Sequence, residues 1–307
     1  MNKPTILSII GISLSLTFSA GLCAMVGSNG NSFMKIPAFT LCVGLAFILQ
    51  WIVFIPSYWY KSEKLFDLNG SATYVVLVFT AFMTMNSIQA RSVLIGILVS
   101  VWAVRLGRFL FIRIQRTGYD SRFVTLKSNF LSFLMVWTLQ GFWVTLTFAT
   151  GLAAMTSGSQ EPLGIYDLFG QSLWALGFAI EVVADNQKQQ FRSTSENAAT
   201  FITHGLWSWS RHPNYFGEII LWTGITLIAF PTLTGLGYIT LISPIFVLVL
   251  LSKVSGIPLL EKQATQRWGN NPAYIRYKSV TPVLIPNPFK RSSTPLSPLP
   301  EDEQISS

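Results

Sequence analysis

Residues that build metal centres and disulfide frameworks are scarce in this sequence. Its 307 residues include two cysteines, Cys23 and Cys42, both inside apolar runs, and two histidines, His204 and His212. This number and spacing exclude a disulfide framework and a histidine-rich metal centre, and we expect no metal ligands. A Gly-x-Gly-x-x-Gly turn after a strand, a P-loop and a Gly-x-Ser-x-Gly elbow are also absent from the sequence. A conventional soluble nucleotide-binding domain is therefore not expected.

Charged residues are equally scarce. They make up 11% of the chain, hydrophobic residues 50%, and the mean hydropathy is +0.48. Because a soluble domain is about a quarter charged, most of this chain must face lipid or other helices. The composition predicts an all-α, polytopic membrane protein whose main partner is the lipid bilayer.

Apolar runs of about 20 residues can cross a bilayer as helices. Two pairs of these runs have very short connections, so one span could be re-entrant or broken, and we expect a bundle of seven or eight transmembrane helices. The runs lie at residues 5–26, 37–60, 72–90, 92–114, 131–153, 165–185, 214–232 and 235–253.

The first run has two interpretations. It follows Lys3 and ends among small residues, which suits a signal peptide, but its length favours a retained helix. We divide the chain into residues 1–36, this helix with an outside loop; residues 37–286, the membrane domain with a motif core at 181–286; and residues 287–307. The last segment contains prolines and an acidic run, which predicts a disordered tail.

The net charge of +8 comes from basic residues whose positions indicate the membrane topology. Nearly all lysines and arginines fall in segments that alternate spans place on one side, including residues 115–130, 186–213 and 254–286, whereas Lys35 and Arg91 fall in loops on the other side. The positive-inside rule makes the basic side cytoplasmic and places both termini there. We therefore expect an integral, multi-pass protein without a nucleic-acid surface.

Chemically versatile side chains are concentrated in the segment Trp207-Ser-Trp-Ser-Arg-His-Pro-Asn-Tyr-Phe-Gly-Glu218. Pro213 suits the first turn of a helix, where free backbone N–H groups and the helix dipole attract anions beside Arg211 and His212. Asn214 and Glu218 are four residues apart and share one helix face. Ionisable groups inside membranes are usually functional. The alternative is an interfacial anchor of Trp, Arg, His and Tyr.

Two further stretches place charge on a helix face. Helical spacing aligns Glu181, Asp185, Gln189 or Lys188, and Arg192, which suggests the wall of a polar cavity; the alternative is a helix end with an internal ion pair. Another stretch aligns Arg105, Arg108, Arg113 and Arg116, a cationic face that suits the phosphates of a nucleotide. The alternative there is a structural pairing of Arg105 with Glu218 or Glu181.

The segment from Gly256 to Gly269 reads as an amphipathic helix, and the part that follows, through Tyr274, Tyr277 and Pro286, reads as extended chain along the membrane surface. Its Glu, Arg and Tyr side chains could close a cofactor site. The alternative is a juxtamembrane segment that binds headgroups.

Several of these motifs together resemble the steroid 5α-reductase-like membrane proteins, in particular the branch known as domain of unknown function 1295. The resemblance covers residues 40–286 in layout. It rests on Ala184-Asp185-x-Gln187-Lys188-x-x-Phe191-Arg192, on Gly205-Leu206-Trp207, on Ser210-Arg211-His212-Pro213-Asn214-Tyr215-Phe216-Gly217-Glu218, and on Tyr277 with Leu284-Ile285-Pro286.

The resemblance implies a helical bundle that binds NADPH in the cytoplasmic half of the membrane and passes hydride to an activated carbon–carbon double bond of a steroid or other lipid-like small molecule. The cofactor-binding positions it implies are Asp185, Arg192, Asn214, Glu218, Arg108, Arg116 and Tyr277, with Tyr274 as an alternative to Tyr277. The anion-attracting helix start adds Arg211 and His212 as candidates.

The sequence departs from the family at the substrate end. Steroid reductases carry Gln-Glu on an early helix, and here the matching pair is Gln50-Trp51, without the acid. The candidates for catalysis are accordingly Glu218, Tyr215 and Gln50. The motifs also resemble the isoprenylcysteine and phospholipid methyltransferases, which bind S-adenosylmethionine and often carry Glu-Glu where this chain has Glu261-Lys262. Methyl transfer is the alternative function, and a non-enzymatic lipid-binding or transport protein is a third interpretation.

Overall fold

The computed structural model describes residues 3–27, 30–159, 161–197 and 199–289. They divide into two compact units: residues up to 174 together with 222–247 form unit 1, and residues 175–221 together with those from 248 onward form unit 2. The 290–307 part of the expected tail lies outside the described residues.

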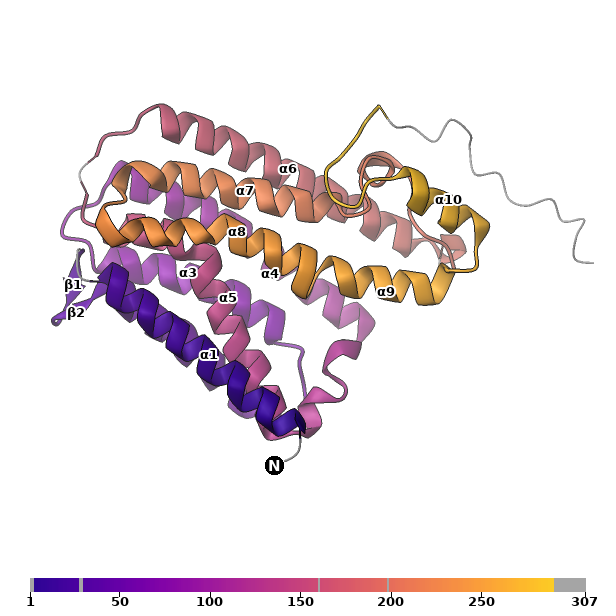
Figure 1. Ribbon diagram of the computed structural model, residues 1–307, viewed down its shortest axis with the longest axis horizontal. Helices are drawn as coiled ribbons and strands as arrows, with labels where there is room; N and C mark the ends of the chain where they lie inside the picture. Colours follow the sequence, from indigo (N-terminus) through magenta and orange to yellow (C-terminus); the bar gives the residue numbers. More distant parts are fainter. Residues whose placement is uncertain (1–2, 28–29, 160, 198, 290–307) are drawn as a thin grey trace, which may run out of the picture. The chain divides into compact units, whose positions relative to one another are not determined.

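Nearly all of the described secondary structure is helical (Figure 1). One two-stranded antiparallel hairpin, β1 (Ser32–Phe33) and β2 (Ile36–Pro37), is an exception within the described chain. The α-helices are α1 (Lys3–Val26), α2 (Ala38–Trp59), α3 (Phe66–Met83), α4 (Ala90–Thr117), α5 (Phe130–Thr156), α6 (Ile165–Ser193), α7 (Pro213–Ala229), α8 (Ile242–Val249), α9 (Ile257–Trp268) and α10 (Pro272–Val280).

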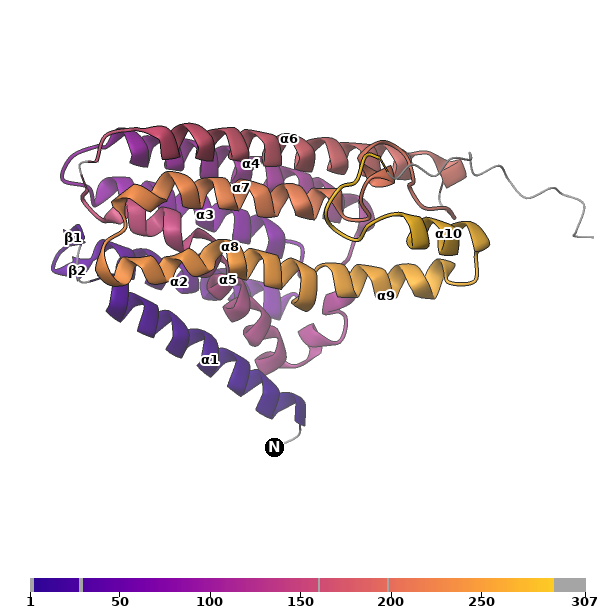
Figure 2. The ribbon, with the colours of Figure 1, turned by 45° about the horizontal axis from the view of Figure 1, so that its top comes forward.

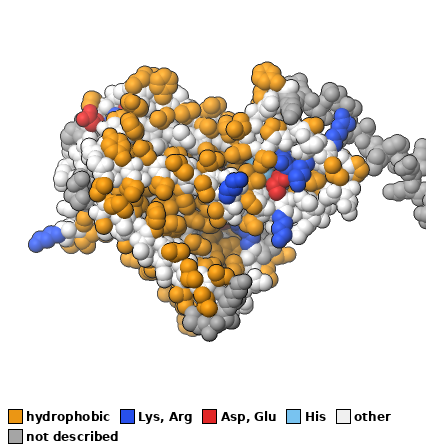
Figure 3. All heavy atoms as spheres, viewed as in Figure 1, with side chains coloured by type: hydrophobic (Ala, Val, Ile, Leu, Met, Phe, Trp, Pro, Cys, Tyr) orange, Lys and Arg blue, Asp and Glu red, His pale blue; other side chains and the backbone are white. Residues whose placement is uncertain are grey.

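Eight helical segments within the described residues are long and apolar enough to cross a bilayer. On the face drawn in Figure 3, most coloured side chains are hydrophobic. The prediction of an all-α, polytopic membrane protein is therefore confirmed. The spans are Thr5–Val26, Ala38–Trp59, Phe66–Met83, Ala90–Thr117, Phe130–Thr156, Ile165–Ser193, Pro213–Thr232 and Gly235–Trp268.

The first helix packs within unit 1 through small polar residues. Ser8, Ser15 and Ser19 of α1 are buried, and Ser8 donates a hydrogen bond to Ser132 of α5 across 3.3 Å. Small side chains let helix backbones approach closely inside a membrane, where lipid supplies no hydrophobic drive for helix association. Figures 1 and 2 show α1 crossing α5. The helix has the packing of a bundle member.

The third span begins earlier than the sequence pattern predicts. The apolar run begins at residue 72, but α3 starts at Phe66. The Phe66 side chain is buried in an aromatic cluster with Phe123 and Trp137, and its carbonyl accepts a hydrogen bond from Gln140. These tertiary contacts stabilise the polar first turn of α3. The helix therefore begins about one and a half turns before the expected span 72–90.

Arg91 was expected in an outside loop, but it lies in the first turn of α4 and is 3% exposed. Its guanidinium donates to both carboxylate oxygens of Asp167, each at 2.8 Å, and to the carbonyls of Glu161 and Pro162. Asp167 also accepts from the N–H of Gly164. This buried, fully bonded pair ties α4 to the start of α6 within unit 1.

Unit 2 contains the C-terminal half of α6, the start of α7, and α9 and α10. Trp207 is buried with Ala184 and Ile202, and Phe201 packs against Trp268, Tyr274 and Tyr277. The expected extended stretch after residue 270 is wrong in its first part. Asn271 caps a helix by accepting from the N–H groups of Ala273 and Tyr274, with Pro272 in the first position, so α10 forms before the chain extends.

The last span is irregular. A 3₁₀ turn at Gly235–Leu241 precedes α8, and a π turn at Leu250–Val254 follows it before α9 begins. Such departures from α geometry occur often at functional sites. The π turn brings the chain to Gly256, where Tyr215 lies close to the glycine within unit 2.

Candidate functional site

The 207–218 motif forms a turn that leads into α7. As expected, Pro213 is the first residue of that helix. A short 3₁₀ turn at Gly205–Ser208 comes first. The side chain of Gln187 on α6 accepts from the N–H of Leu206, and the indole of Trp207 donates to the carbonyl of Ala184. The motif is thus fixed on the polar half of α6.

Helices α6 and α7 approach closely at a pair of glycines. A β-carbon on Gly217 would lie 2.5 Å from the carbonyl oxygen of Gly177 and 2.8 Å from the backbone nitrogen of Glu181. Only glycine fits such a contact. Figures 1 and 2 both draw the two helices side by side. The approach brings Asn214 to Asp185, to which its amide donates at 3.2 Å.

The expected polar stripe of α6 changes from buried to exposed along the helix. Glu181 and Asp185 are buried, Lys188 is half-buried and Arg192 is exposed. The ammonium of Lys188 lies 4.4 Å from the centre of the Trp207 ring, a cation–π contact with the motif. The structure therefore brings Asp185 and Asn214 together, and places Arg192 further along the same helix.

Arg211 and His212 converge on Glu261 of α9. Nη1 of Arg211 donates to one carboxylate oxygen of Glu261, and Nε2 of His212 lies 3.0 Å from the other. Lys278 of α10 approaches the same carboxylate at 3.6 Å. Glu261 is thus the centre of a network of three basic side chains, two of which belong to the motif.

Two polar atoms of this network are buried without a hydrogen-bond partner among the described residues, namely Nε of Arg211 and Nδ1 of His212. Burial lowers the pKa of His212 below its usual value, although the hydrogen bond and charge of Glu261 oppose that shift. The neutral ring is therefore favoured. Because a carboxylate only accepts, the ring proton lies on Nε2 and leaves Nδ1 as an acceptor.

The remaining motif residues flank this network. The Tyr215 ring stacks parallel to the His212 ring, with centroids 5.7 Å apart, and Glu218 is half-buried on α7. The hydroxyl of Tyr277 donates to the carbonyl of Trp207 at 2.7 Å. Burial raises the pKa of Tyr277, so this hydroxyl stays protonated. The Tyr277 side chain therefore supports the motif by holding the backbone carbonyl of Trp207.

The other expected residues belong to unit 1. Arg108 and Arg116 are exposed on α4, and the Arg105 guanidinium lies 5.3 Å from the centre of the Phe109 ring. Gln50 is 0% exposed. Its amide donates to Thr73 at 2.8 Å and accepts from Asn69 at 2.7 Å, so both of its ends are engaged between α2 and α3. This is an interhelical hydrogen-bond network.

The sequence analysis included Glu261 only among the Glu, Arg and Tyr side chains that could close a cofactor site. It did not predict the pairing of Glu261 with Arg211 and His212. The available signal is that Glu261 is a lone acid among several basic residues between 253 and 289. No group of three or more metal-ligating His, Cys, Asp or Glu side chains is found in the described part of the chain.

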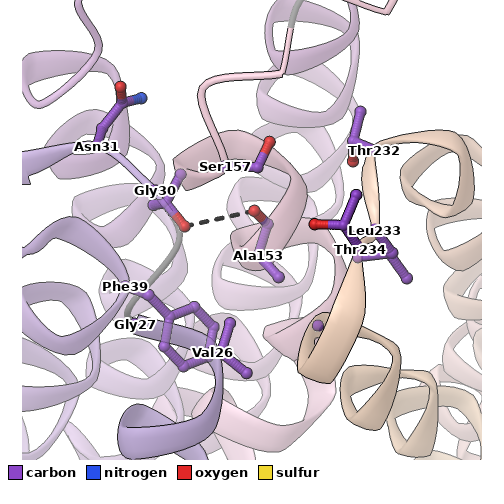
Figure 4. A pocket seen from close by; sticks show the side chains of 12 residues that line it. Val26, Gly27, Gly30, Asn31, Phe39, Ala153, Ser157, Thr232, Leu233 and Thr234 are labelled. Atoms are coloured by element: carbon purple, nitrogen blue, oxygen red, sulfur yellow. Dashed lines mark hydrogen bonds between the residues drawn. The ribbon is translucent and has the colours of Figure 1, made fainter.

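A small cavity lies elsewhere, in unit 1 (Figure 4). It has a volume of about 30 Å³, room for about two water molecules. The loop before β1, the end of α5 and the turn after α7 supply its polar lining, including Asn31, Ser157, Thr232 and Thr234. The lining carries no charged side chain, so this cavity offers no counterpart to the charged network of unit 2.

Comparisons with known proteins place the chain in a family. Residues 53–281 match the family model described as "Protein of unknown function (DUF1295)". The chain is also similar to the uncharacterized protein C594.04c of Schizosaccharomyces pombe, with 21% identity over 217 residues, and the match spans 60% of this chain and 62% of that protein. No solved structure matches. The chain belongs to the DUF1295 family of proteins of unknown function.

Proposed function

We propose that this protein is an integral membrane oxidoreductase that binds NADPH in unit 2 and reduces a carbon–carbon double bond of a hydrophobic, lipid-like small molecule. The observation that carries the proposal is the pair of buried, unpartnered atoms at Arg211 Nε and His212 Nδ1. Burial of polar groups without partners is costly, so such atoms in a charged cluster point to a ligand.

The donor set fits a phosphoribosyl group. Nε–H of Arg211 would donate to a phosphate oxygen, and Nδ1 of His212 would accept from a ribose hydroxyl. The dipole at the start of α7 and the charges of Lys188 and Lys278 favour an anion in the same region. Asp185 and Asn214, joined across α6 and α7, would hold the amide end of the cofactor.

NADPH, when bound, supplies a hydride to one carbon of the double bond and becomes NADP⁺. The other carbon must gain a proton, and Tyr215 and Glu218 are the candidate donors in unit 2. Gln50 is a poor candidate because an amide does not release protons and both of its ends are engaged. The proposal therefore leaves Gln50 a packing role.

A second function is favoured by one observation. Glu261 places a carboxylate beside Arg211 and His212, and S-adenosylmethionine carries a cationic amino group and a sulfonium that a carboxylate would bind. A membrane methyltransferase is therefore the alternative. Arg211 and Lys278 more than offset the single negative charge of Glu261. The net positive charge of this group favours the anionic NADPH over S-adenosylmethionine.

The test is thermal stabilisation of the purified full-length protein in detergent. A ligand at 100 times its Kd stabilises by about 2.7 kcal/mol, so NADPH should raise the melting temperature measurably and S-adenosylmethionine should not. Asp185→Ala and Arg192→Ala should reduce the NADPH effect without unfolding the protein. Lys262→Ala, which removes an exposed positive charge of α9, is the matched control. Stabilisation by S-adenosylmethionine alone would reverse the assignment.

A further inference from the structure

The chain after α10 follows the 207–218 motif as an irregular segment with several bends. We call residues 281–287 the strap. The carbonyl of Pro282 accepts from the N–H of Arg211 at 2.9 Å, and the N–H of Asn287 donates to the carbonyl of Trp209 at 2.9 Å. These two bonds join segments about 70 residues apart in the sequence, all within unit 2.

Ser210 lies at the centre of this contact and is 0% exposed. Its hydroxyl donates to the carbonyl of Leu284 at 2.8 Å and accepts from the N–H of His212 at 3.1 Å. One side chain thus links the strap to the backbone of His212, directly before α7 begins. The N–H of His212 would otherwise lack a partner at the helix start.

The strap is rigid by composition. Pro282 and Pro286 fix their own φ angles and disfavour helix in the residues before them, so little conformational entropy is lost when the segment docks. Its docking holds Trp209 and Arg211 by their backbones and Ser210 by its hydroxyl, and leaves the side chains of Arg211 and His212 directed to Glu261.

We propose that Ser210 is a positioning residue and that, through it, the strap sets the orientation of Arg211 and His212 for cofactor binding. The inference rests on the proposed function for the cofactor, but the orientation itself can be measured without a cofactor. The chain offers a suitable probe because its two histidines differ: His212 is 5% exposed and His204 is exposed.

The experiment measures ethoxycarbonylation of both histidines by diethyl pyrocarbonate, using mass spectrometry on the full-length protein in detergent. In the wild-type protein His204 reacts and His212 is protected. Ser210→Ala should raise the rate at His212 relative to His204 by about tenfold, the change in a local opening equilibrium expected when one buried hydrogen bond is lost. Ser208→Ala is the matched control, because the hydroxyl of Ser208 donates only within its own turn, to Gly205.

A second pair of variants tests the strap from its other side and covers the case in which Ser210→Ala does not fold. Asn287→Pro removes the N–H that donates to Trp209, whereas Asn287→Ala keeps it. Of these two variants, only Asn287→Pro should expose His212. For both Ser210→Ala and Asn287→Pro, the Kd of NADPH should rise by about tenfold.

The outcomes separate the two proposals. Unchanged reactivity of His212 in both Ser210→Ala and Asn287→Pro would overturn the positioning role. Higher reactivity in a protein that NADPH never stabilises would support the positioning role and reject NADPH as the ligand. Higher reactivity with an unchanged Kd of NADPH would also overturn the inference, since orientation by the strap would then be irrelevant to binding.

Discussion

The amide of Asn214 donates a hydrogen bond to the carboxylate of Asp185, and these two residues lie on separate helices that touch through glycine. The bond depends on how closely α6 and α7 approach. Neither residue is held in this geometry by its own helix alone. The contact between Gly177 and Gly217 is therefore a condition for the candidate site.

Gly217→Ala should separate the two helices. The new methyl group would lie 2.5 Å from the carbonyl oxygen of Gly177, and the obstacle is backbone on both sides. We expect a loss of about 1–3 kcal/mol in the free energy of unfolding and a weaker NADPH effect, because Asn214 moves away from Asp185. Gly44→Ala is the control: an added methyl on this exposed helical glycine meets nothing within 4 Å, so stability should hold or rise by up to about 1 kcal/mol. Equal effects of the two substitutions in thermal denaturation would contradict this reading.

Arg91→Ala should be among the most damaging substitutions in unit 1. It leaves Asp167 buried without its counter-charge, which costs about 3–5 kcal/mol. Arg122→Ala breaks an exposed pair with Asp120 and should cost at most about 1 kcal/mol. In the double variant Arg91→Met, Asp167→Leu, no buried charge is stranded, so it should unfold at a higher temperature than Arg91→Ala. A double variant less stable than the single one would show that the hydrogen bonds to the carbonyls of Glu161 and Pro162 matter more than the charge.

Glu63 predicts an acid-dependent loss of stability. Burial alone would raise its pKa, but hydrogen bonds from Lys127 at 2.7 Å and from the backbone N–H of Asp120 at 2.8 Å outweigh burial, so the pKa lies below the ordinary 4.5. A group with a lowered folded-state pKa stabilises the protein above its unfolded-state pKa, and the contribution disappears as the pH falls through the folded-state value.

Wild type should therefore exceed Glu63→Gln in melting temperature at pH 7, and the difference should shrink below about pH 4.5. Glu161→Gln, which removes an exposed carboxylate, is the matched control. A gap between wild type and Glu63→Gln that is constant with pH would assign the effect to shape rather than charge.

The sequence predicted the helices well because long apolar runs decide where a chain crosses a bilayer. The start of α7 at Pro213 and the gradient from Glu181 to Arg192 also follow from local rules. The displaced start of α3 does not, because it depends on tertiary contacts of Phe66. The pairing of Arg91 with Asp167 joins residues 76 positions apart, which no helical period encodes.

Glu261 shows the same limit at the site. Its position on an amphipathic helix was predictable, but its partners Arg211 and His212 lie 50 and 49 residues away. The irregular turn at Leu250–Val254 and the docking of the strap decide where α9 meets the motif. The sequence shows the prolines of the strap but not the residues that the strap contacts. A resemblance in motifs identifies the residues without giving the network that joins them.

Glu261→Gln distinguishes the two candidate cofactors. The amide keeps the shape of the side chain and removes its charge, so Nη1 of Arg211 is released for a phosphate and the repulsion of an anion decreases. NADPH binding should persist or tighten, even though the cofactor-free protein melts at a lower temperature because three basic groups have lost their shared acid. S-adenosylmethionine, whose amino group and sulfonium are cationic, should bind less well. Titration of the melting temperature with each cofactor measures both effects, and a loss of NADPH binding together with retained binding of S-adenosylmethionine would contradict the reductase assignment.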